Sequence, residues 1–307
     1  MPSHLLLFNP MADRGRSGQK ASDLRAMVAQ LSADVGGADW HGTEYPAHAT
    51  EVAAQAADNG YTTVVALGGD GTVHEVINGL MRIPAERRPR LGVVPIGSGN
   101  DFAYAVGAPM NAQEAVRRAF TGSERAVDVA HIQDGSGRGE YFNNTAGIGF
   151  DAAINIQTRK LKLVTGFVMY LTATLLSIAR NFKAPHMKVT YDGGVLDQPI
   201  LMLTIGNGPR EGGGFVTTPA SKVDDGLLDF LYIGQVSQFR MLQLLPKVMN
   251  GTHIHEPDVK IATTTRFSIE ADRALPIHID GELFAPYEAN VRKVEVRVEA
   301  GAVRVVV

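Results

Sequence analysis

The sequence predicts an α/β plus all-β protein: an N-terminal three-layer αβα domain over residues 1–125, then a β-rich, β-sandwich-like domain over residues 126–307. Short apolar runs alternate with helical patterns in the first part, which is typical of a parallel sheet covered by helices. Strict polar–apolar alternation replaces them later, which is typical of antiparallel strands with one wet face. The length of 307 residues also fits two domains of roughly 100–200 residues each. The alternative is that the last strands of the chain belong to the sheet of the first domain.

Three apolar runs in the first domain, at 5–8, 64–67 and 91–95, predict strands that are buried on both faces. Asn111 and Glu114 predict a helix N-terminus with a capping box. Other helices are predicted by apolar residues at helical spacing: Leu24, Met27, Val28 and Leu31, then Val73, Val76, Ile77 and Leu80.

The second domain carries alternating segments at 267–270, 277–280 and 293–299, which predict half-exposed strands. Two helices are expected among them, an uncharged one over Leu163–Ala179 and a short one from Ser237 to about Leu245. The uncharged segment is only at the lower edge of the roughly 17–25 residues that span a bilayer. We therefore expect a buried or membrane-facing helix and no transmembrane helix.

Composition excludes several classes of function. Lys and Arg number 29 against 32 Asp and Glu, so there is no basic excess to bind nucleic acid. The absence of cysteine excludes disulfides, thiolate metal sites and a cysteine nucleophile, and fits a cytoplasmic protein. The edge strands of an antiparallel sheet can pair across a two-fold axis, so a homodimer is compatible with the sequence.

The strongest local feature is a buried strand followed by Gly68-Gly69-Asp70-Gly71-Thr72 and a predicted helix. Glycines allow close approach of backbone N–H groups to an anion, and a helix N-terminus adds positive potential, so this segment predicts a phosphate site. Asp70 would repel phosphate unless it binds Mg²⁺ or transfers a proton. The alternative is a tight strand–helix turn with Asp70 as the N-cap.

A second glycine loop, Gly97-Ser98-Gly99-Asn100-Asp101, follows the next strand. Loops after neighbouring parallel strands meet at the carboxyl edge of the sheet, where Ser98 can donate to a phosphate oxygen. Asn100 and Asp101 are both candidates for the cap of the next helix, and capping is the expected role of Asp101. A third loop, Asn9 to Gly15, leaves the first strand, and none of the three is a Walker-type loop.

These motifs occur in a specific order along nearly the whole chain. Together they resemble the diacylglycerol kinase catalytic domain family, which includes bacterial soluble lipid kinases and sphingosine kinases. The motifs are Asn9-Pro10, Gly68–Thr72, Gly97–Phe102, Gly147-Ile148-Gly149-Phe150-Asp151, Gly212-Gly213-Gly214-Phe215, Asp225-Gly226-Leu227-Leu228-Asp229 and Asp280-Gly281-Glu282.

The resemblance implies an ATP site in the first domain. Its residues are Asn9, Pro10, Thr43, Gly68, Gly69, Asp70, Gly71, Thr72, Val73, His74 and Ser98. One residue departs from the family pattern: Asp13 stands where relatives usually have Gly, and it should repel phosphate unless it turns outward.

The resemblance also implies acidic and metal-binding residues. Asp280 and Glu282 match the family's acid pair, of which one is the general base, and Asp70 joins them as a catalytic candidate. A structural Mg²⁺ would be held by the carbonyls of Lys222 and Leu227 and the Asp225 carboxylate. From the residues alone, Asp280-Gly281 is equally well explained as a hairpin turn.

The expected function is therefore an ATP- and Mg²⁺-dependent kinase of a diacylglycerol-like lipid, working from the cytoplasm at the membrane surface. Residues of the 163–179 helix are expected in the core or along an acyl-chain site. The alternatives are a NAD kinase, or a nucleotide- or lipid-binding regulator without turnover. His253 and His255 are expected at the surface rather than on a metal.

Overall fold

A computed structural model describes residues 2–161, 166–180 and 182–307. The chain divides into two units, which we call unit 1 (Met1–Val129 and Ala300–Val307) and unit 2 (Ala130–Glu299). Two strands, β5 (Glu124–Asp134) and β15 (Lys293–Val306), continue from one unit into the other.

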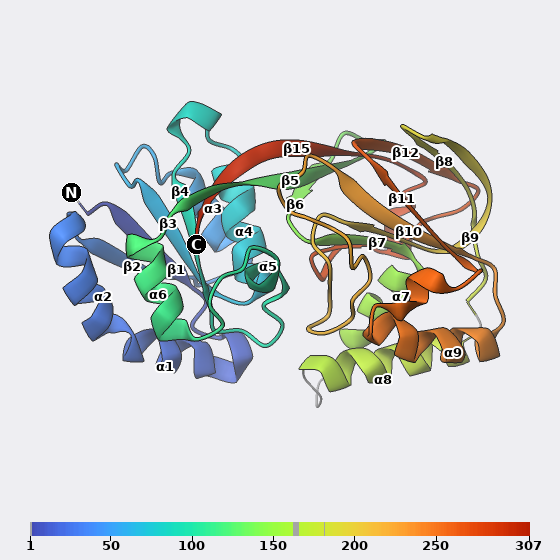
Figure 1. Ribbon diagram of the computed structural model, residues 1–307, viewed down its shortest axis with the longest axis horizontal. Helices are drawn as coiled ribbons and strands as arrows, with labels where there is room; N and C mark the ends of the chain where they lie inside the picture. Colours follow the sequence, from blue (N-terminus) through green and yellow to red (C-terminus); the bar gives the residue numbers. More distant parts are fainter. Residues whose placement is uncertain (1, 162–165, 181) are drawn as a thin grey trace. The chain divides into compact units, whose positions relative to one another are not determined.

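Unit 1 is a parallel sheet with helices on both faces (Figure 1). Its strands are β1 (His4–Phe8), β2 (Ala38–Gly42), β3 (Thr63–Gly68) and β4 (Arg90–Pro95), and the end of β15 pairs with β4. Its helices are α1 (Arg16–Asp23), α2 (Arg25–Ser32), α3 (His48–Ala54), α4 (Asp70–Leu80), α5 (Asp101–Ala105) and α6 (Ala112–Thr121), with 3₁₀ turns at Ala12–Gly15, Ala33–Val35 and Ala85–Arg87.

The three predicted strands and both helical stripes of unit 1 are confirmed. The strands are buried on both faces, as continuous apolar runs require. The predicted N-cap is present too, since Asn111 Oδ1 accepts the N–H groups of Gln113 at 3.0 Å and Glu114 at 3.1 Å. Helices α1, α2 and α6 cover one face of the sheet, and α3 packs on α4 over the other.

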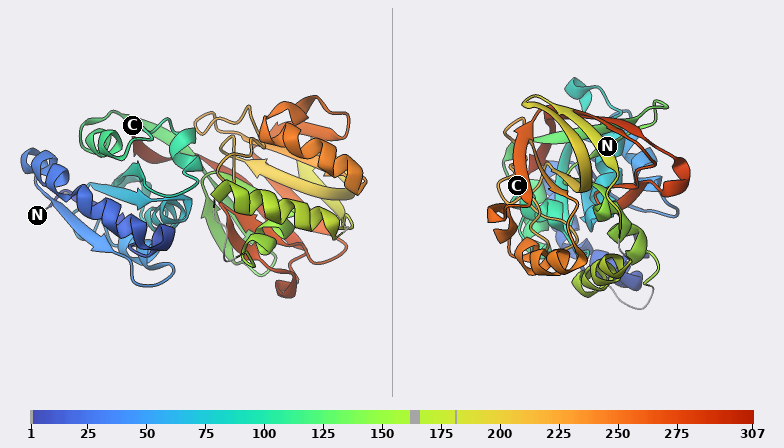
Figure 2. Two further views of the ribbon diagram at one scale, coloured as in Figure 1. Left: turned by 90° about the horizontal axis from the view of Figure 1, so that it is seen from below. Right: turned by 90° about the vertical axis from the view of Figure 1, so that its right-hand side faces the viewer.

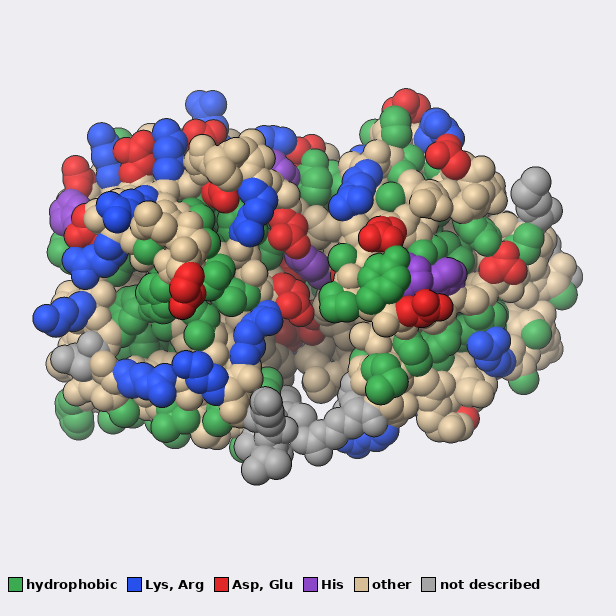
Figure 3. Space-filling view, turned by 180° about the vertical axis from the view of Figure 1, so that it is seen from behind, with side chains coloured by type: hydrophobic (Ala, Val, Ile, Leu, Met, Phe, Trp, Pro, Cys, Tyr) green, Lys and Arg blue, Asp and Glu red, His purple; other side chains and the backbone are tan. Residues whose placement is uncertain are grey.

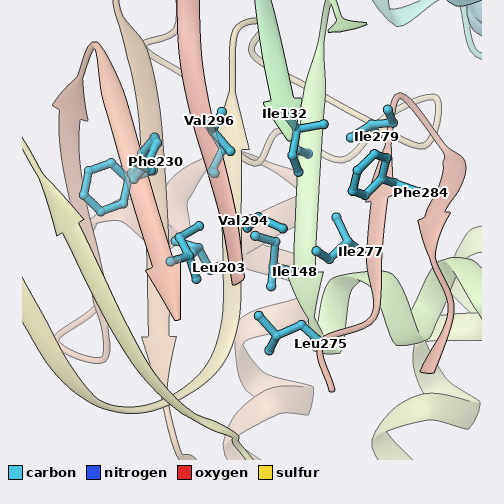
Figure 4. Packing of buried hydrophobic residues seen from close by; sticks show 14 of the residues in the cluster. Ile132, Ile148, Leu203, Phe230, Leu275, Ile277, Ile279, Phe284, Val294 and Val296 are labelled. Atoms are coloured by element: carbon cyan, nitrogen blue, oxygen red, sulfur yellow. The ribbon is translucent and has the colours of Figure 1, made fainter. Parts of the chain in front are cut away.

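Unit 2 is a sandwich of two mainly antiparallel sheets around an apolar core (Figure 4). One sheet has the order β14-β13-β7-β9-β10-β11, and the other contains β8, β12, β15, β5 and β6. The long strand β9 pairs with β8 through its first half and with β7 and β10 through its second half. The strands not yet bounded are β6 (Gly139–Phe142), β7 (Thr145–Gly149), β8 (His186–Tyr191), β9 (Gly194–Gly206), β10 (Leu228–Gly234), β11 (Val259–Thr264), β12 (Arg266–Ala271), β13 (Ile277–Ile279) and β14 (Glu282–Ala285).

Three helices cover the outer face of one sheet of unit 2. They are α7 (Phe150–Thr158), α8 (Gly166–Ala179) and α9 (Gln238–Met249), with 3₁₀ turns at Thr252–His255 and Tyr287–Ala289. Figures 1 and 2 show all three helices on the same side of the strands. Of the predicted uncharged helix, residues 163–165 lie outside the described part of the chain.

Helix α9 continues four residues past its predicted end at Leu245, so that boundary was wrong. Ser237 caps its start, with Oγ accepting the Arg240 N–H at 3.2 Å. Pro246 lies inside the helix and cannot donate to the carbonyl of Leu242. Because Leu242 is 45% exposed, water can satisfy that carbonyl and the helix does not have to stop.

A buried histidine makes the stability of unit 1 depend on pH. His4 is 3% exposed and stacks on Phe120, with ring centroids 4.4 Å apart. Burial, assisted by the charge of Arg90, lowers its pKa from 6.5 to about 4. The unfolded chain therefore binds more protons between these values, and stability falls as the pH falls through this window. We expect His4 to contribute a loss of about 2 kcal/mol between pH 7 and pH 5.

Denaturant unfolding at pH 7 and pH 5 measures this effect. In His4→Gln the difference between the two free energies of unfolding should shrink by about 2 kcal/mol. The exposed His255 provides the control, since His255→Gln should leave the difference unchanged. An unaltered pH dependence in His4→Gln would show that His4 is not responsible.

Candidate functional site

The strand register of unit 1 brings the predicted loops to one edge of the sheet. Phe8 pairs with Gly42 and Leu67, and Gly68 pairs with Pro95, so the four strands end together. The segments that follow are Asn9-Pro10, Thr43, Gly69-Asp70 and Ile96-Gly97-Ser98. The structure thus gathers the predicted nucleotide residues at the carboxyl edge, with the Thr43 N–H donating to the Phe8 carbonyl at 2.9 Å.

The same edge contains a topological switch point. The chain leaves β1 toward α1 and α2, on one face of the sheet, and leaves β3 into α4, on the opposite face. The connections that follow the neighbouring strands β1 and β3 therefore cross opposite faces of the sheet. Where two such connections diverge, they leave a crevice at the carboxyl edge, and open α/β sheets bind their ligands in this crevice.

The two glycine loops touch each other, and their lack of side chains is required. A Cβ on Gly97 would lie 2.4 Å from the Gly69 Cα, and one on Gly68 would lie 2.2 Å from Thr72 Oγ1. Residues with side chains would force the loops apart. The glycines thus leave bare backbone at the N-terminus of α4, a suitable place for phosphate oxygens.

Asp70 is the first residue of α4, with Gly69 in the N-cap position. Its Oδ1 accepts the Phe102 N–H at 3.1 Å, which ties α4 to the start of α5. The expected cap by Asp101 was wrong. Asn100 holds the N-cap position of α5, and its side chain bonds the N–H and the carbonyl of Gly97, so it closes the loop instead.

The predicted nucleotide residues differ in accessibility. Ser98 is exposed, whereas Thr72, Val73 and His74 are buried within α4. Asn9 uses Oδ1 to accept the Met11 N–H at 2.9 Å, which shapes the first loop. The side chain of Asp13 lies outside the described part of the structure.

Lys20 is a neighbour of these loops that sequence reasoning missed. It projects from α1, and its ammonium donates to the Ile96 carbonyl at 2.9 Å, directly before Gly97. A cation beside a phosphate cradle favours anion binding. No local pattern could reveal it, because the contact depends on how α1 packs on the sheet.

The predicted Mg²⁺ residues of unit 2 lie in the short segment that precedes β10. Asp225 is exposed, and its Oδ1 accepts the Leu227 N–H at 3.1 Å across Gly226, whose φ is 73°. A carboxylate and two nearby carbonyls are hard oxygen donors of the kind that Mg²⁺ prefers, so the residues present fit this ion. Burial raises the pKa of the neighbouring Asp229, and the Asp225 charge adds to this effect.

Asp280 and Glu282 have different environments in the β13–β14 hairpin. Asp280 and Gly281 form its two-residue loop, with φ values of 49° and 82°, as a type I′ turn requires. Asp280 also accepts three backbone N–H groups, from Asn143 at 2.9 Å, Asn144 at 2.8 Å and Thr145 at 3.1 Å. Glu282 is 55% exposed in its side chain and pairs with Arg159 at 2.9 Å.

An apolar pocket lies in unit 2 between the three helices and strands β9 and β10. Sequence spacing could not reveal it, because its lining comes from dispersed segments. Asp151 and Glu211 are the acidic residues in this lining. The others are Phe150, Ile154, Tyr170, Thr174, Ile178, Leu201, Met202, Phe215, Thr217, Ile233, Val236, Met241, Leu244, Leu245 and Val248.

Of the two histidines expected at the surface, His253 and His255, one is buried. His255 is exposed as expected, but His253 is fully buried and its Nε2 lies 2.9 Å from the Thr217 carbonyl. Burial lowers the pKa of His253. His253 therefore fixes the segment that follows Phe215 rather than facing solvent.

Comparison with known proteins identifies relatives of both units. Residues 3–132 match the family model "Diacylglycerol kinase catalytic domain", and residues 144–307 match "YegS C-terminal NAD kinase beta sandwich-like domain". No helix in the described part of the chain is long and apolar enough to cross a membrane.

Individual relatives are similar over most of their length. A "Probable lipid kinase YegS-like" of Chromohalobacter salexigens is 35% identical over 75% of this chain and 73% of its own. A protein of the same name from Yersinia enterocolitica is 32% identical over 92% and 90%. The "Diacylglycerol kinase" of Bacillus subtilis is 28% identical over 79% and 78%. A solved diacylglycerol kinase structure from Bacillus anthracis str. Sterne shares the fold, with a TM-score of 0.73 at 23% identity, covering 99% of this chain and 96% of that one.

Proposed function

The chain belongs to the diacylglycerol kinase catalytic domain family of lipid kinases, and on this premise we propose that it transfers the γ-phosphoryl group of ATP to the hydroxyl of a diacylglycerol-like lipid. As a member of this family it is a phosphotransferase that acts on an alcohol group. The observation that carries the proposal is the meeting of two glycine loops around Asp70 at the switch point of the parallel sheet.

The nucleotide is assigned to unit 1. The N–H groups at the start of α4, together with Ser98 and Lys20, would hold the phosphates. Mg²⁺, when bound, would neutralise charge on the transferred group, and the Asp70 carboxylate, which lies between the two glycine loops, would hold it. The turn at Lys222, Asp225 and Leu227 would hold a second, structural Mg²⁺.

We assign proton removal from the lipid hydroxyl to Glu282. Its carboxylate is exposed and, among the described residues, is held by one exposed ion pair, so it can exchange partners at little cost. Asp280 instead accepts three backbone N–H groups, and its assigned role is to fix the segment from Asn143 to Thr145. Of the two acidic residues, Glu282 is therefore assigned to the reaction and Asp280 to the structure of the hairpin and its neighbouring segment.

The lipid chain is assigned to the apolar pocket of unit 2. Leu245→Trp, which fills the pocket from α9, should lower kcat/KM for diacylglycerol about tenfold and leave the KM for ATP unchanged. Loss of contact with two methylene groups is sufficient for this effect, at about 0.8 kcal/mol each. The control is Gln243→Trp, at an exposed residue of the same helix that lies neither in the pocket nor among the exposed apolar side chains. Equal effects of the two substitutions would contradict the assignment.

Docking at the cytoplasmic surface of a membrane is assigned to α8 and α9. Large apolar side chains on both helices are exposed: Val168, Leu175, Leu176, Phe239 and Leu242. Helix α8 has no charged residue, and α8 packs against α9. On the face drawn in Figure 3, acidic and basic side chains are interspersed, so neither sign of charge dominates that face. The proposal rests on insertion of the exposed apolar side chains of α8 and α9.

A direct assay tests the function. The full chain is incubated with radiolabelled ATP and Mg²⁺, with parallel reactions on diacylglycerol, a panel of other hydroxyl lipids in mixed micelles, NAD, and micelles without acceptor. We expect labelled phospholipid only in the lipid reactions. Phosphorylated NAD would favour the NAD kinase alternative, and nucleotide binding without any labelled lipid would favour a silent regulator.

A further inference from the structure

Three chemically active side chains meet in the interior of unit 2 outside the groups assigned to phosphoryl transfer. They are Asp151 at the start of α7, Glu211 after β9 and His278 in β13, and they are 1%, 5% and 1% exposed. One ligand atom from each lies within 4.8 Å of the others. His278 Nε2 is 3.4 Å from Asp151 Oδ1 and 3.9 Å from Glu211 Oε2.

The strand register explains how these residues meet. On adjacent strands, Gly147 of β7 pairs with His278 of β13 on one side and Thr204 of β9 on the other. A Cβ on Gly147 would lie 2.2 Å from His278 Nε2 and 2.4 Å from Asp151 Oδ2. The glycine thus leaves the space into which the imidazole and the Asp151 carboxylate extend.

His278 Nε2 and Asp151 Oδ1 face each other at 3.4 Å as an ion pair, and neither atom has a hydrogen bond to another residue in the described ranges. The carboxylates are oriented from behind by hydroxyl groups. Thr204 donates to Asp151 Oδ2 at 2.6 Å, and Thr145 donates to Glu211 Oε2 at 2.9 Å. Oriented ligands with outer hydrogen bonds are a recurrent feature of protein metal sites.

Charge balance also favours a cation. Two ionised carboxylates bring a charge of −2 into the interior, and a protonated imidazole would offset only half of it. Buried charge is costly unless it is paired or coordinates a metal, and a divalent ion balances both carboxylates. Two ligand atoms at about 2.1 Å from a tetrahedral Zn²⁺ lie about 3.4 Å apart, which matches the distance from His278 Nε2 to Asp151 Oδ1, whereas the 3.9 Å to Glu211 Oε2 would have to shorten on binding.

From these observations we propose that Asp151, Glu211 and His278 bind a divalent transition-metal ion of the Zn²⁺ type. The imidazole ligand distinguishes this site from the all-oxygen turn at Asp225, which suits Mg²⁺. Because Asp151 and Glu211 also line the apolar pocket, the ion lies at the polar end of that pocket. The site is independent of the kinase assignment.

Zinc titration of the full chain tests the site. Chelator-treated protein is titrated calorimetrically with ZnCl₂, and its metal content is measured by mass spectrometry. We expect one tightly bound equivalent of Zn²⁺, a rise in Tm on binding, and visible d–d absorption when Co²⁺ replaces Zn²⁺. Mg²⁺ at the same concentration should not compete.

Two variants and one control make the result specific. His278→Gln and Glu211→Gln should each weaken Zn²⁺ binding by at least about tenfold and remove the Zn²⁺-dependent rise in Tm. Either variant suffices if the other fails to fold. His255→Gln, at an exposed histidine, should bind Zn²⁺ like the natural chain. The proposal is overturned if the natural chain binds no Zn²⁺, or if both buried-site variants bind it with unchanged affinity.

Discussion

Asp70→Asn is expected to lower the rate of lipid phosphorylation by about 10²–10³-fold while the protein stays folded. An amide keeps an oxygen that can accept the Phe102 N–H, a bond of 3.1 Å in the natural chain, so the junction of α4 and α5 is preserved. The amide removes the negative charge, and with it the capacity to hold Mg²⁺ at the phosphates. Steady-state kinetics with saturating ATP and lipid, together with thermal unfolding, separate the two effects.

Glu75 on the same helix provides a matched control. Its two carboxylate oxygens accept the N–H groups of Ala47 at 3.0 Å and Ala49 at 3.1 Å, so within the described ranges the carboxylate is held by backbone. In Glu75→Gln the side-chain NH₂ would face the N–H group of Ala47 or Ala49, so one of the two hydrogen bonds is lost. This loss should lower the free energy of unfolding by about 1–3 kcal/mol and leave kcat nearly unchanged. If Asp70→Asn retained normal turnover, the role assigned to Asp70 would be wrong.

Unit 1 could be predicted well because its signals are local. Apolar runs fix the strands, and Gly68–Thr72 and Gly97–Asp101 follow them directly. Parallel pairing alone then places both loops at one edge. Lys20 escaped prediction because its contact with Ile96 depends on the packing of α1.

Unit 2 shows where alternation misleads. The pattern Ile277-His278-Ile279 predicts an exposed His278, yet all three residues are buried. The strand lies between β7 and β14, and α7 packs over its second face. A two-residue period reports only which side chains share a face, and tertiary packing decides whether that face meets water. The buried group of Asp151, Glu211 and His278 was hidden for this reason.

Glu282→Gln is expected to lower kcat by about 10²–10⁴-fold with an unchanged Tm, because it removes the assigned general base but only an exposed ion pair from the fold. The limb of the kcat/KM pH profile that reports the base should disappear. Glu270→Gln is the matched control. Glu270 is also 55% exposed and pairs with an exposed cation, Lys293, at 3.2 Å. Its loss should alter neither kcat nor Tm.

Asp280→Asn should show the opposite pattern, with a lowered Tm and a kcat that is mostly retained. Asparagine tolerates the left-handed backbone of this turn, and Asn-Gly is a favoured type I′ pair, so the hairpin itself is retained. The amide NH₂ that replaces one carboxylate oxygen cannot accept an N–H, so at least one of the three bonds to residues 143–145 is lost, at a cost of about 1–3 kcal/mol. A lowered Tm with most of kcat retained fits a structural carboxylate. Loss of turnover at unchanged Tm in Asp280→Asn, with an active Glu282→Gln, would instead make Asp280 the proton acceptor, because the hydrogen bonds that hold it would then serve to aim it.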